Sequence, residues 1–198
     1  MTRLVEQDAI RDAARALRGI AIDTPLLPAH WLGEEIGAEV RLKCENLQRA
    51  GAFKIRGAYT MISRLPEETR RNGVITYSSG NHAQAVALAA GIFGIPAVVV
   101  MPTTAPRVKV EGAKRLGAEV VFEGTTSAER HRRALDIASQ RGLAMVPPFD
   151  HPDIIAGQGT AGLEITRDWP DVDAVLVPIG GGGLASGIAA WVKRERPR

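Results

Sequence analysis

The alternation of short apolar runs with helical periodicity is the feature that most constrains this fold. Residues 98–100 and 120–122 are apolar without interruption, which is typical of strands buried on both faces. Helical stretches lie around and between these runs, at residues 83–93, 108–116 and 127–140. This order predicts right-handed crossovers and an α/β fold of open, mostly parallel sheets with flanking helices. Ligands of such sheets bind beyond the carboxyl ends of the strands.

The remaining periodicities extend the same pattern along the chain. Further helices are expected at residues 5–17, 58–65, 160–167 and 184–192. The expected strands are residues 39–43, 74–77, 95–101, 118–122, 143–146 and 174–177. No internal repeat and no low-complexity linker interrupts this order.

Composition excludes several classes of protein. The 198 residues, 45% hydrophobic and 24% charged, fit one large or two small globular domains and exclude a disordered chain. No apolar stretch approaches the roughly 20 residues that cross a bilayer, and the N-terminus lacks the apolar core of a signal peptide. Cys44 is the single cysteine, so we expect a reducing, cytoplasmic location. The four histidines lack ligand spacing, so no metal site is predicted.

Charge argues against a nucleic-acid partner. Lys and Arg number 25 against 22 Asp and Glu, and aromatic residues make up 5%. Short basic runs at residues 130–133 and 193–198 are typical of solvated surfaces, whereas nucleic-acid binding asks for a stronger patch with aromatic residues. We expect neither nucleic acid nor a membrane as partner.

Three segments carry unusual chemistry, and Lys54 lies in the first. It follows a loop and opens a helix, where the positive end of the helix dipole disfavours an ammonium and lowers its pKa. A lysine with a lowered pKa suits nucleophilic or Schiff-base chemistry. A solvated surface lysine is the alternative, and Arg56 and Gly57 are in isolation ordinary helix-start residues.

The second and third segments are turns between a strand and a helix. Ser78, Ser79, Asn81 and His82 lie in a turn whose backbone N–H groups can hold an anion, although Ser79 or Asn81 could simply cap the helix. Gly180, Gly181, Gly182 and Gly183 let the backbone wrap closely around a phosphate, and a flexible loop is the alternative. An amine, an anion-binding turn and a monophosphate site together fit pyridoxal phosphate.

Four motifs extend this interpretation to a family. They are Gly-Ala-Phe-Lys-Ile-Arg-Gly at 51–57, Ser-Ser-Gly-Asn-His at 78–82, His-Pro-Asp-Ile-Ile-Ala-Gly-Gln-Gly-Thr at 151–160 and the glycines at 180–183. With these motifs the chain resembles the pyridoxal-phosphate enzymes of the tryptophan-synthase-β fold, in the serine/threonine dehydratase (threonine ammonia-lyase) and serine racemase branch. The resemblance runs from about residue 24 onward.

The resemblance implies a role for each matching residue. Lys54 corresponds to the lysine that bonds to the cofactor and moves the α-proton, and Phe53 to the residue packed on the cofactor ring. Asn81 corresponds to the partner of the ring hydroxyl. The phosphate site corresponds to Gly180, Gly181, Gly182, Gly183 and Leu184. Ser78, Ser79, Asn81 and His82 correspond to the loop that holds the substrate carboxylate, Ser79 also to the second acid/base of racemases, and Arg130, through a looser alignment, to a substrate-binding arginine.

The resemblance also implies the fold and its division. Residues 1–72 and 149–198 would form a large cofactor-binding lobe, and residues 73–148 a small mobile lobe, as in fold type II of these enzymes. Ala52 stands where the family often has serine, which leaves the substrate open. Family members continue well past the glycine loop, so the large lobe is expected to be incomplete, in a truncated or frame-shifted reading, a fragment or half of a split enzyme.

The reaction implied is β-elimination from L-threonine or L-serine, giving a 2-oxo acid and ammonia. Serine racemase is one alternative, and a non-catalytic fragment that binds pyridoxal 5′-phosphate is another. The partner is a small hydroxy-amino acid, with hydroxyaspartate also open, and a homodimer is expected for the full-length form.

Overall fold

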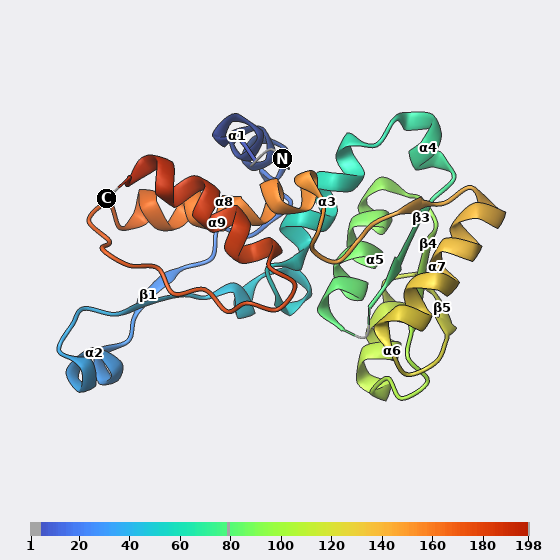
Figure 1. The fold of residues 1–198 in the computed structure, drawn as a ribbon, viewed down its shortest axis with the longest axis horizontal. Helices are drawn as coiled ribbons and strands as arrows, with labels where there is room; N and C mark the ends of the chain where they lie inside the picture. Colours follow the sequence, from blue (N-terminus) through green and yellow to red (C-terminus); the bar gives the residue numbers. More distant parts are fainter. Residues whose placement is uncertain (1–4, 79, 198) are drawn as a thin grey trace.

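A four-stranded parallel sheet forms one half of the computed structural model, which describes residues 5–78 and 80–197 (Figure 1). The strand order is β5-β4-β3-β6, and the strands are β3 (Val74–Tyr77), β4 (Ala97–Met101), β5 (Glu119–Phe122) and β6 (Ala144–Met145). Parallel strands need long crossovers. The helices that supply them are α5 (Asn81–Phe93), α6 (Arg107–Arg115) and α7 (Ser127–Arg141).

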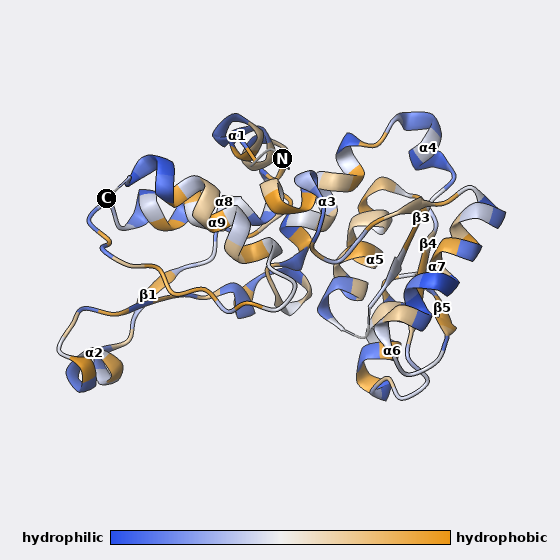
Figure 2. Ribbon diagram, viewed as in Figure 1, coloured by the Kyte–Doolittle hydropathy of each residue, from blue (hydrophilic) through white to orange (hydrophobic). Residues whose placement is uncertain are grey.

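Both faces of this sheet are covered. Val74, Val99 and Met101 share one apolar cluster with residues of α5, whereas Ile75 and Val98 pack on the other face with residues of α7. A strand buried on both faces has no polar side to alternate with. This arrangement confirms the expectation for residues 98–100. It is wrong for residues 120–122, because β5 is an edge strand whose Val120 and Val121 are partly buried and whose Phe122 is 47% exposed. Figure 2 shows the hydrophobic colour of β4 and β5.

The other half of the structure contains four helices, of which α8 is central and contacts the other three. They are α1 (Gln7–Ala16), α3 (Lys54–Arg64), α8 (Pro152–Asp168) and α9 (Gly183–Glu195). Glycines bring these helices close: a Cβ on Gly157 of α8 would lie 2.4 Å from the carbonyl oxygen of Arg56 on α3. Ile10 and Trp191 fill the space between α1, α8 and α9.

Short elements connect these parts. Strand β1 (Leu26–Pro28) pairs antiparallel with β2 (Arg41–Lys43), and α2 (His30–Ile36) lies between them in sequence. The other short elements are the 3-10 turns η1 (Glu45–Leu47) and η2 (Arg49–Gly51) and helix α4 (Glu67–Arg71). Of these, the sequence predicted only the strand at 39–43, because elements of three to seven residues are too short to show a clear periodicity.

The predicted helix at 160–167 begins eight residues too late. The structure starts α8 at Pro152, with His151 as the N-cap residue that accepts a hydrogen bond from the Asp153 N–H. Glycine disfavours helix, so Gly157 and Gly159 hid the first turns from a periodicity argument. Likewise α3 begins at Lys54 rather than at residue 58, which places the lysine in the first turn.

The predicted strand at 174–177 is wrong. This segment has irregular backbone, and within the described residues no backbone hydrogen bond joins it to a strand. Ala174 and Leu176 are exposed, Leu176 at 92%, and Val175 and Val177 are partly exposed. The apolar composition is that of a strand, but a strand exists only where a neighbour satisfies its N–H and C=O groups.

The division into a large and a small lobe stays a prediction. The parallel sheet and its helices lie at one side of α3, and α8 and α9 lie at the other (Figure 1). Among the residues described, no helix is both long and apolar enough to cross a membrane.

Candidate functional site

Lys54 is the first residue of α3, and its amine is partly buried. The Nζ atom donates a hydrogen bond to the carbonyl oxygen of Pro148 at 2.7 Å and lies 5.2 Å from the centre of the Phe53 ring. Burial lowers the pKa of Lys54 below its ordinary value, because desolvation disfavours the ammonium form. The prediction of a helix-start lysine with a lowered pKa is therefore confirmed, with burial as the cause.

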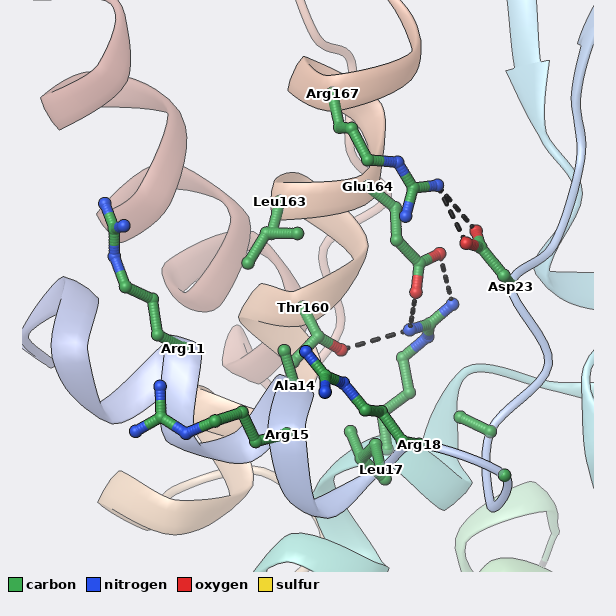
Figure 3. A pocket seen from close by; sticks show the side chains of 13 residues that line it. Arg11, Ala14, Arg15, Leu17, Arg18, Asp23, Thr160, Leu163, Glu164 and Arg167 are labelled. Carbon is green, nitrogen blue, oxygen red and sulfur yellow. Dashed lines mark hydrogen bonds and ion pairs between the residues drawn. The ribbon is translucent and has the colours of Figure 1, made fainter.

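A buried ion network fixes the start of α3. The Arg56 guanidinium, 1% exposed, donates to Glu45 at 2.7 and 2.8 Å and to Glu164 at 2.6 and 2.8 Å. It also donates to the Thr160 hydroxyl at 3.0 Å, and Figure 3 shows Thr160 and Glu164 extending from the same helix toward one point. The local sequence predicted an ordinary helix-start residue at Arg56, and the structure shows instead the centre of a buried ion network. Its partners lie up to 108 positions away, which local sequence cannot reveal.

The turn at 78–82 lies between the carboxyl end of β3 and the start of α5. The Gly80 N–H donates to the Ser78 hydroxyl at 3.2 Å, and Gly80 is the N-cap residue of α5 without a side-chain cap. Asn81 is exposed and does not cap the helix, so the capping alternative is wrong for this residue. Ser79 lies outside the described residues. Among the described residues, no side chain caps the first backbone N–H groups of α5, which have no partner within the helix itself.

His82 is a buried structural link from α5 to the residue that follows β6. Its Nε2 lies 3.1 Å from the carbonyl oxygen of Val146, and its Nδ1 has no partner among the described residues. Burial lowers the pKa of His82 to about 3; the Val146 carbonyl opposes this shift and the charge of Lys54 adds to it. The imidazole is therefore neutral near pH 7, with its proton on Nε2.

This burial predicts a pH-dependent stability. The unfolded chain takes up the His82 proton near pH 6.5, whereas the folded chain takes it up near pH 3. Between these values the unfolded state binds more protons, so the free energy of unfolding falls as the pH drops, by up to about 1.4 kcal/mol per pH unit. Urea unfolding at intervals from pH 7 to pH 5 measures this slope, above the range where carboxylates titrate.

Two variants isolate the contribution of His82. His82→Gln should flatten the slope between pH 7 and pH 5, because it removes the titrating group. His30→Gln, at an exposed position on α2, should leave it unchanged. Equal slopes in the wild type and His82→Gln would show that His82 does not control acid stability.

The glycine loop ends at the start of α9. Gly182 has a φ of +87°, in the left-handed region that favours glycine, and α9 begins at Gly183. A Cβ on Gly181 would lie 2.1 Å from the Phe149 ring, and a Cβ on Gly183 would lie 2.9 Å from the Phe149 carbonyl oxygen. The same atom on Gly180 or Gly182 would meet nothing within 4 Å. The loop therefore contacts Phe149 at Gly181 and Gly183 and has open space at Gly180 and Gly182. It leads into a helix start, whose first N–H groups have no partner within the helix.

One segment that sequence reasoning missed links the three predicted segments. The residues that follow β6 contact His82 through the Val146 carbonyl, Lys54 through the Pro148 carbonyl and the glycine loop through Phe149. The consecutive prolines Pro147 and Pro148 were the available signal, since proline has no N–H and fixes φ. The structure therefore brings Lys54, His82 and the glycine loop around a common segment.

Arg130 is the predicted residue with the weakest link to this site. It lies in the first turn of α7, is 9% exposed, and donates from Nη1 to the Thr125 carbonyl at 3.1 Å. Its Nε has no partner in the described part of the chain. The Tyr77 and His131 rings are 4.6 Å apart, which places this end of α7 near the carboxyl end of β3. No described contact joins Arg130 to Lys54.

An amine at one helix start and a glycine loop at another define a class of protein. Such a site suits a cofactor with one aldehyde and one phosphate, as in pyridoxal-phosphate enzymes. Residues 17–198 match the family "Pyridoxal-phosphate dependent enzyme", and the chain belongs to it.

The chain is similar to relatives with several printed activities. It is 49% identical over 194 residues to L-threonine ammonia-lyase of Thermotoga maritima, covering 98% of this chain and 48% of that protein. It is 47% identical over 185 residues to L-threo-3-hydroxyaspartate ammonia-lyase of a Pseudomonas species, covering 93% and 58%. The structure of maize serine racemase superposes with a TM-score of 0.96 at 38% identity, covering 98% of this chain and 59% of that one. The chain thus spans about half the length of these proteins.

The residues present fit pyridoxal 5′-phosphate, the cofactor of this family. Lys54 offers a partly buried amine with a lowered pKa. The glycine loop offers an opening that a side chain would narrow, lined by the amides of a helix start. The exposed Asn81 side chain, which does not cap its helix, is available to hydrogen-bond a ligand.

Proposed function

We propose that this chain carries the cofactor and substrate sites of a pyridoxal-phosphate-dependent ammonia-lyase. The reaction eliminates water from L-threonine or L-serine, and hydrolysis of the released enamine takes up one water to give a 2-oxo acid and ammonia. The relatives support an amino-acid lyase or racemase, and the choice of threonine or serine is our proposal.

The contact of Lys54 with the segment after β6 carries this proposal. The Lys54 amine is held by a hydrogen bond to the Pro148 carbonyl, and its burial lowers its pKa, which favours the neutral amine. The same segment contacts the glycine loop and the start of α5, where a phosphate and a carboxylate would bind. An amine between two anion sites matches the shape of an amino acid bound next to a phosphorylated cofactor.

Each residue then has a defined task. The cofactor, when bound, supplies the electron sink for the carbanion chemistry. Lys54 Nζ accepts the α-proton, for which an amine with a pKa near the working pH is best suited. Phe53 packs against the cofactor ring, Asn81 binds its hydroxyl, and residues 180–184 hold the phosphate. We propose that Ser78, Ser79, Asn81 and the backbone N–H of His82 orient the substrate carboxylate, and that Arg130 adds a cation from the small lobe.

Serine racemase is the second candidate, favoured by the superposition on the maize enzyme. It would use the same residues, with Ser79 returning the proton on the face opposite Lys54. The two functions differ in product, because racemisation retains the hydroxyl that elimination removes.

The test measures both products with the purified, cofactor-loaded chain. L-threonine and L-serine should give 2-oxo acid and ammonia in equal amounts, with little D-isomer. Ser79→Ala should lower the elimination rate less than the racemisation rate, and in a racemase it would stop formation of D-serine. D-serine as the main product would replace the lyase by the racemase. Bound cofactor without turnover of either substrate would favour a non-catalytic cofactor-binding fragment.

A further inference from the structure

A second cavity, of about 520 Å³, lies between α1 and α8 beside the buried ion network (Figure 3). The buried side chains that line it are those of Leu17, Arg56 and Thr160. Sites for small molecules commonly have volumes of about 300 to 1,000 Å³, so this cavity has room for more than a single ion. Its described lining residues include none from the glycine loop or from the turn at 78–82.

Arginines dominate the charge of this cavity. Five of them line it, against two carboxylates, those of Asp23 and Glu164. Glu164 already accepts from Arg56 and lies 2.6 Å from the Lys43 ammonium. Asp23 pairs with Arg167 at 2.8 Å. Both carboxylates are therefore engaged by cations on the α3 and α8 side, and the arginines on the α1 side keep an excess of positive charge.

The three arginines on the α1 side have few competing partners. They are Arg11, Arg15 and Arg18, spaced by four and three positions, so they lie on one face of α1 and of the turn that follows it (Figure 3). Arg18 forms neither an ion pair nor a side-chain hydrogen bond with a described residue. Arg15 has an exposed pair with Asp12 on its own helix, and Arg11 lies 3.4 Å from Glu195. Exposed pairs of this kind are weak, so an anion here would displace no strong interaction.

An apolar strip lies between the arginines of this cavity. Ala14 and Leu17 line it on the α1 side, and Leu163 lines it on the α8 side (Figure 3). An inorganic ion would leave this strip in water, whereas a ligand with a small apolar group would cover it. The planar fork of an arginine matches the oxygens of a phosphate. The lining thus suits a molecule that carries both a phosphate and an apolar group.

We propose that the cavity between α1 and α8 binds a small organic phosphate, with the phosphate on Arg15 and Arg18 and the apolar group on Ala14 and Leu163. The inference goes beyond the proposed reaction and does not depend on it. Such a ligand would join α1 to α8 next to Arg56, and it would therefore stabilise the folded chain by mass action.

Calorimetry on the cofactor-loaded chain tests this site, with phenyl phosphate as the probe at constant ionic strength. The wild type should bind it saturably and more tightly than inorganic phosphate, because the phenyl ring covers the apolar strip. Arg18→Gln should weaken binding about tenfold or more, since a charge-assisted hydrogen bond is lost. The control Arg107→Gln, at an exposed position on α6, should match the wild type.

Thermal unfolding provides a readout that needs no turnover. Phenyl phosphate should raise the Tm of the wild type and of Arg107→Gln, and the same concentration should raise that of Arg18→Gln much less. Failure of the wild type to bind would overturn the proposal. Equal affinities of Arg18→Gln and Arg107→Gln would do the same, because general charge attraction would then account for binding.

Two further outcomes would also contradict the site. Release of pyridoxal phosphate when phenyl phosphate is added would place the probe at the cofactor's own phosphate site. Equal affinity for inorganic phosphate and phenyl phosphate would show that the apolar strip of Ala14 and Leu163 contacts no ligand.

Discussion

Replacing Lys54 by alanine should abolish covalent retention of pyridoxal phosphate and nearly all turnover. The amine is the group that attaches the cofactor and moves the α-proton in the proposed reaction, and loss of a positioned acid/base alone lowers rates by about 10²–10⁴-fold. Borohydride reduction, followed by digestion and peptide mapping, should place the cofactor on the peptide that contains Lys54. In Lys54→Ala no cofactor label should appear on this peptide. The glycine loop should still bind the cofactor reversibly.

Two comparisons make this result specific. Lys114→Ala, at an exposed position on α6, should keep both the label and the activity. Lys54→Ala should not lose thermal stability, because a partly desolvated ammonium at a helix start is unfavourable in the folded state. Normal turnover by Lys54→Ala, or label spread evenly over surface lysines, would contradict the assignment of Lys54.

Replacing Arg56 by alanine should cost about 3–5 kcal/mol of unfolding free energy, because it breaks a buried ion network from the inside. The guanidinium is 1% exposed, and Glu45 and Glu164 would keep their charges with one cation fewer. Burial raises the pKa of Glu45, but the hydrogen bonds from Arg56 and Thr24 outweigh this effect and hold the pKa below 4.5. Urea unfolding at pH 7 measures the loss.

A surface arginine and a charge-neutral core variant provide the controls. Arg107→Ala should change stability by no more than about 0.5 kcal/mol, since the Arg107 side chain is 91% exposed. Arg56→Met combined with Glu45→Gln removes one charge of each sign and should recover part of the loss, because Glu164 keeps the Lys43 ammonium as its partner at 2.6 Å. A loss in Arg56→Ala no larger than in Arg107→Ala would show that the network is energetically unimportant.

The sequence was sufficient where the signal is local. The apolar runs of β3 and β4 and the stripes of α5, α6 and α7 predicted their elements to within two residues at most ends. Lys54 could be placed at a helix start because the loop and the helix are adjacent in sequence. Likewise, the position of the glycines between an apolar run and a helix already indicated a phosphate-binding loop.

The rest depended on contacts between distant residues. Lys54 and Pro148 are 94 positions apart, and His82 and Val146 are 64 apart, so no window of sequence contains either pair. The segment at 174–177 was predicted as a strand that the structure does not contain. Its composition favours a strand, but a strand forms only where a neighbouring strand pairs with it. Glycines in α8 misled the helix prediction because they allow close packing, of Gly157 against α3 and of Gly159 against α1 and α9, at the expense of helix propensity.

The proline pair after β6 has a mechanical consequence. The predicted boundary between the lobes falls at residues 148 and 149, inside the segment that contacts Lys54, His82 and the glycine loop. Pro147 and Pro148 fix two φ angles, so fewer free backbone angles remain there to absorb a rotation of one lobe against the other. Such a rotation would instead change the distance between the Pro148 carbonyl and the Lys54 amine, which lie on opposite sides of the predicted boundary, so that this hydrogen bond would report how far the lobes have closed.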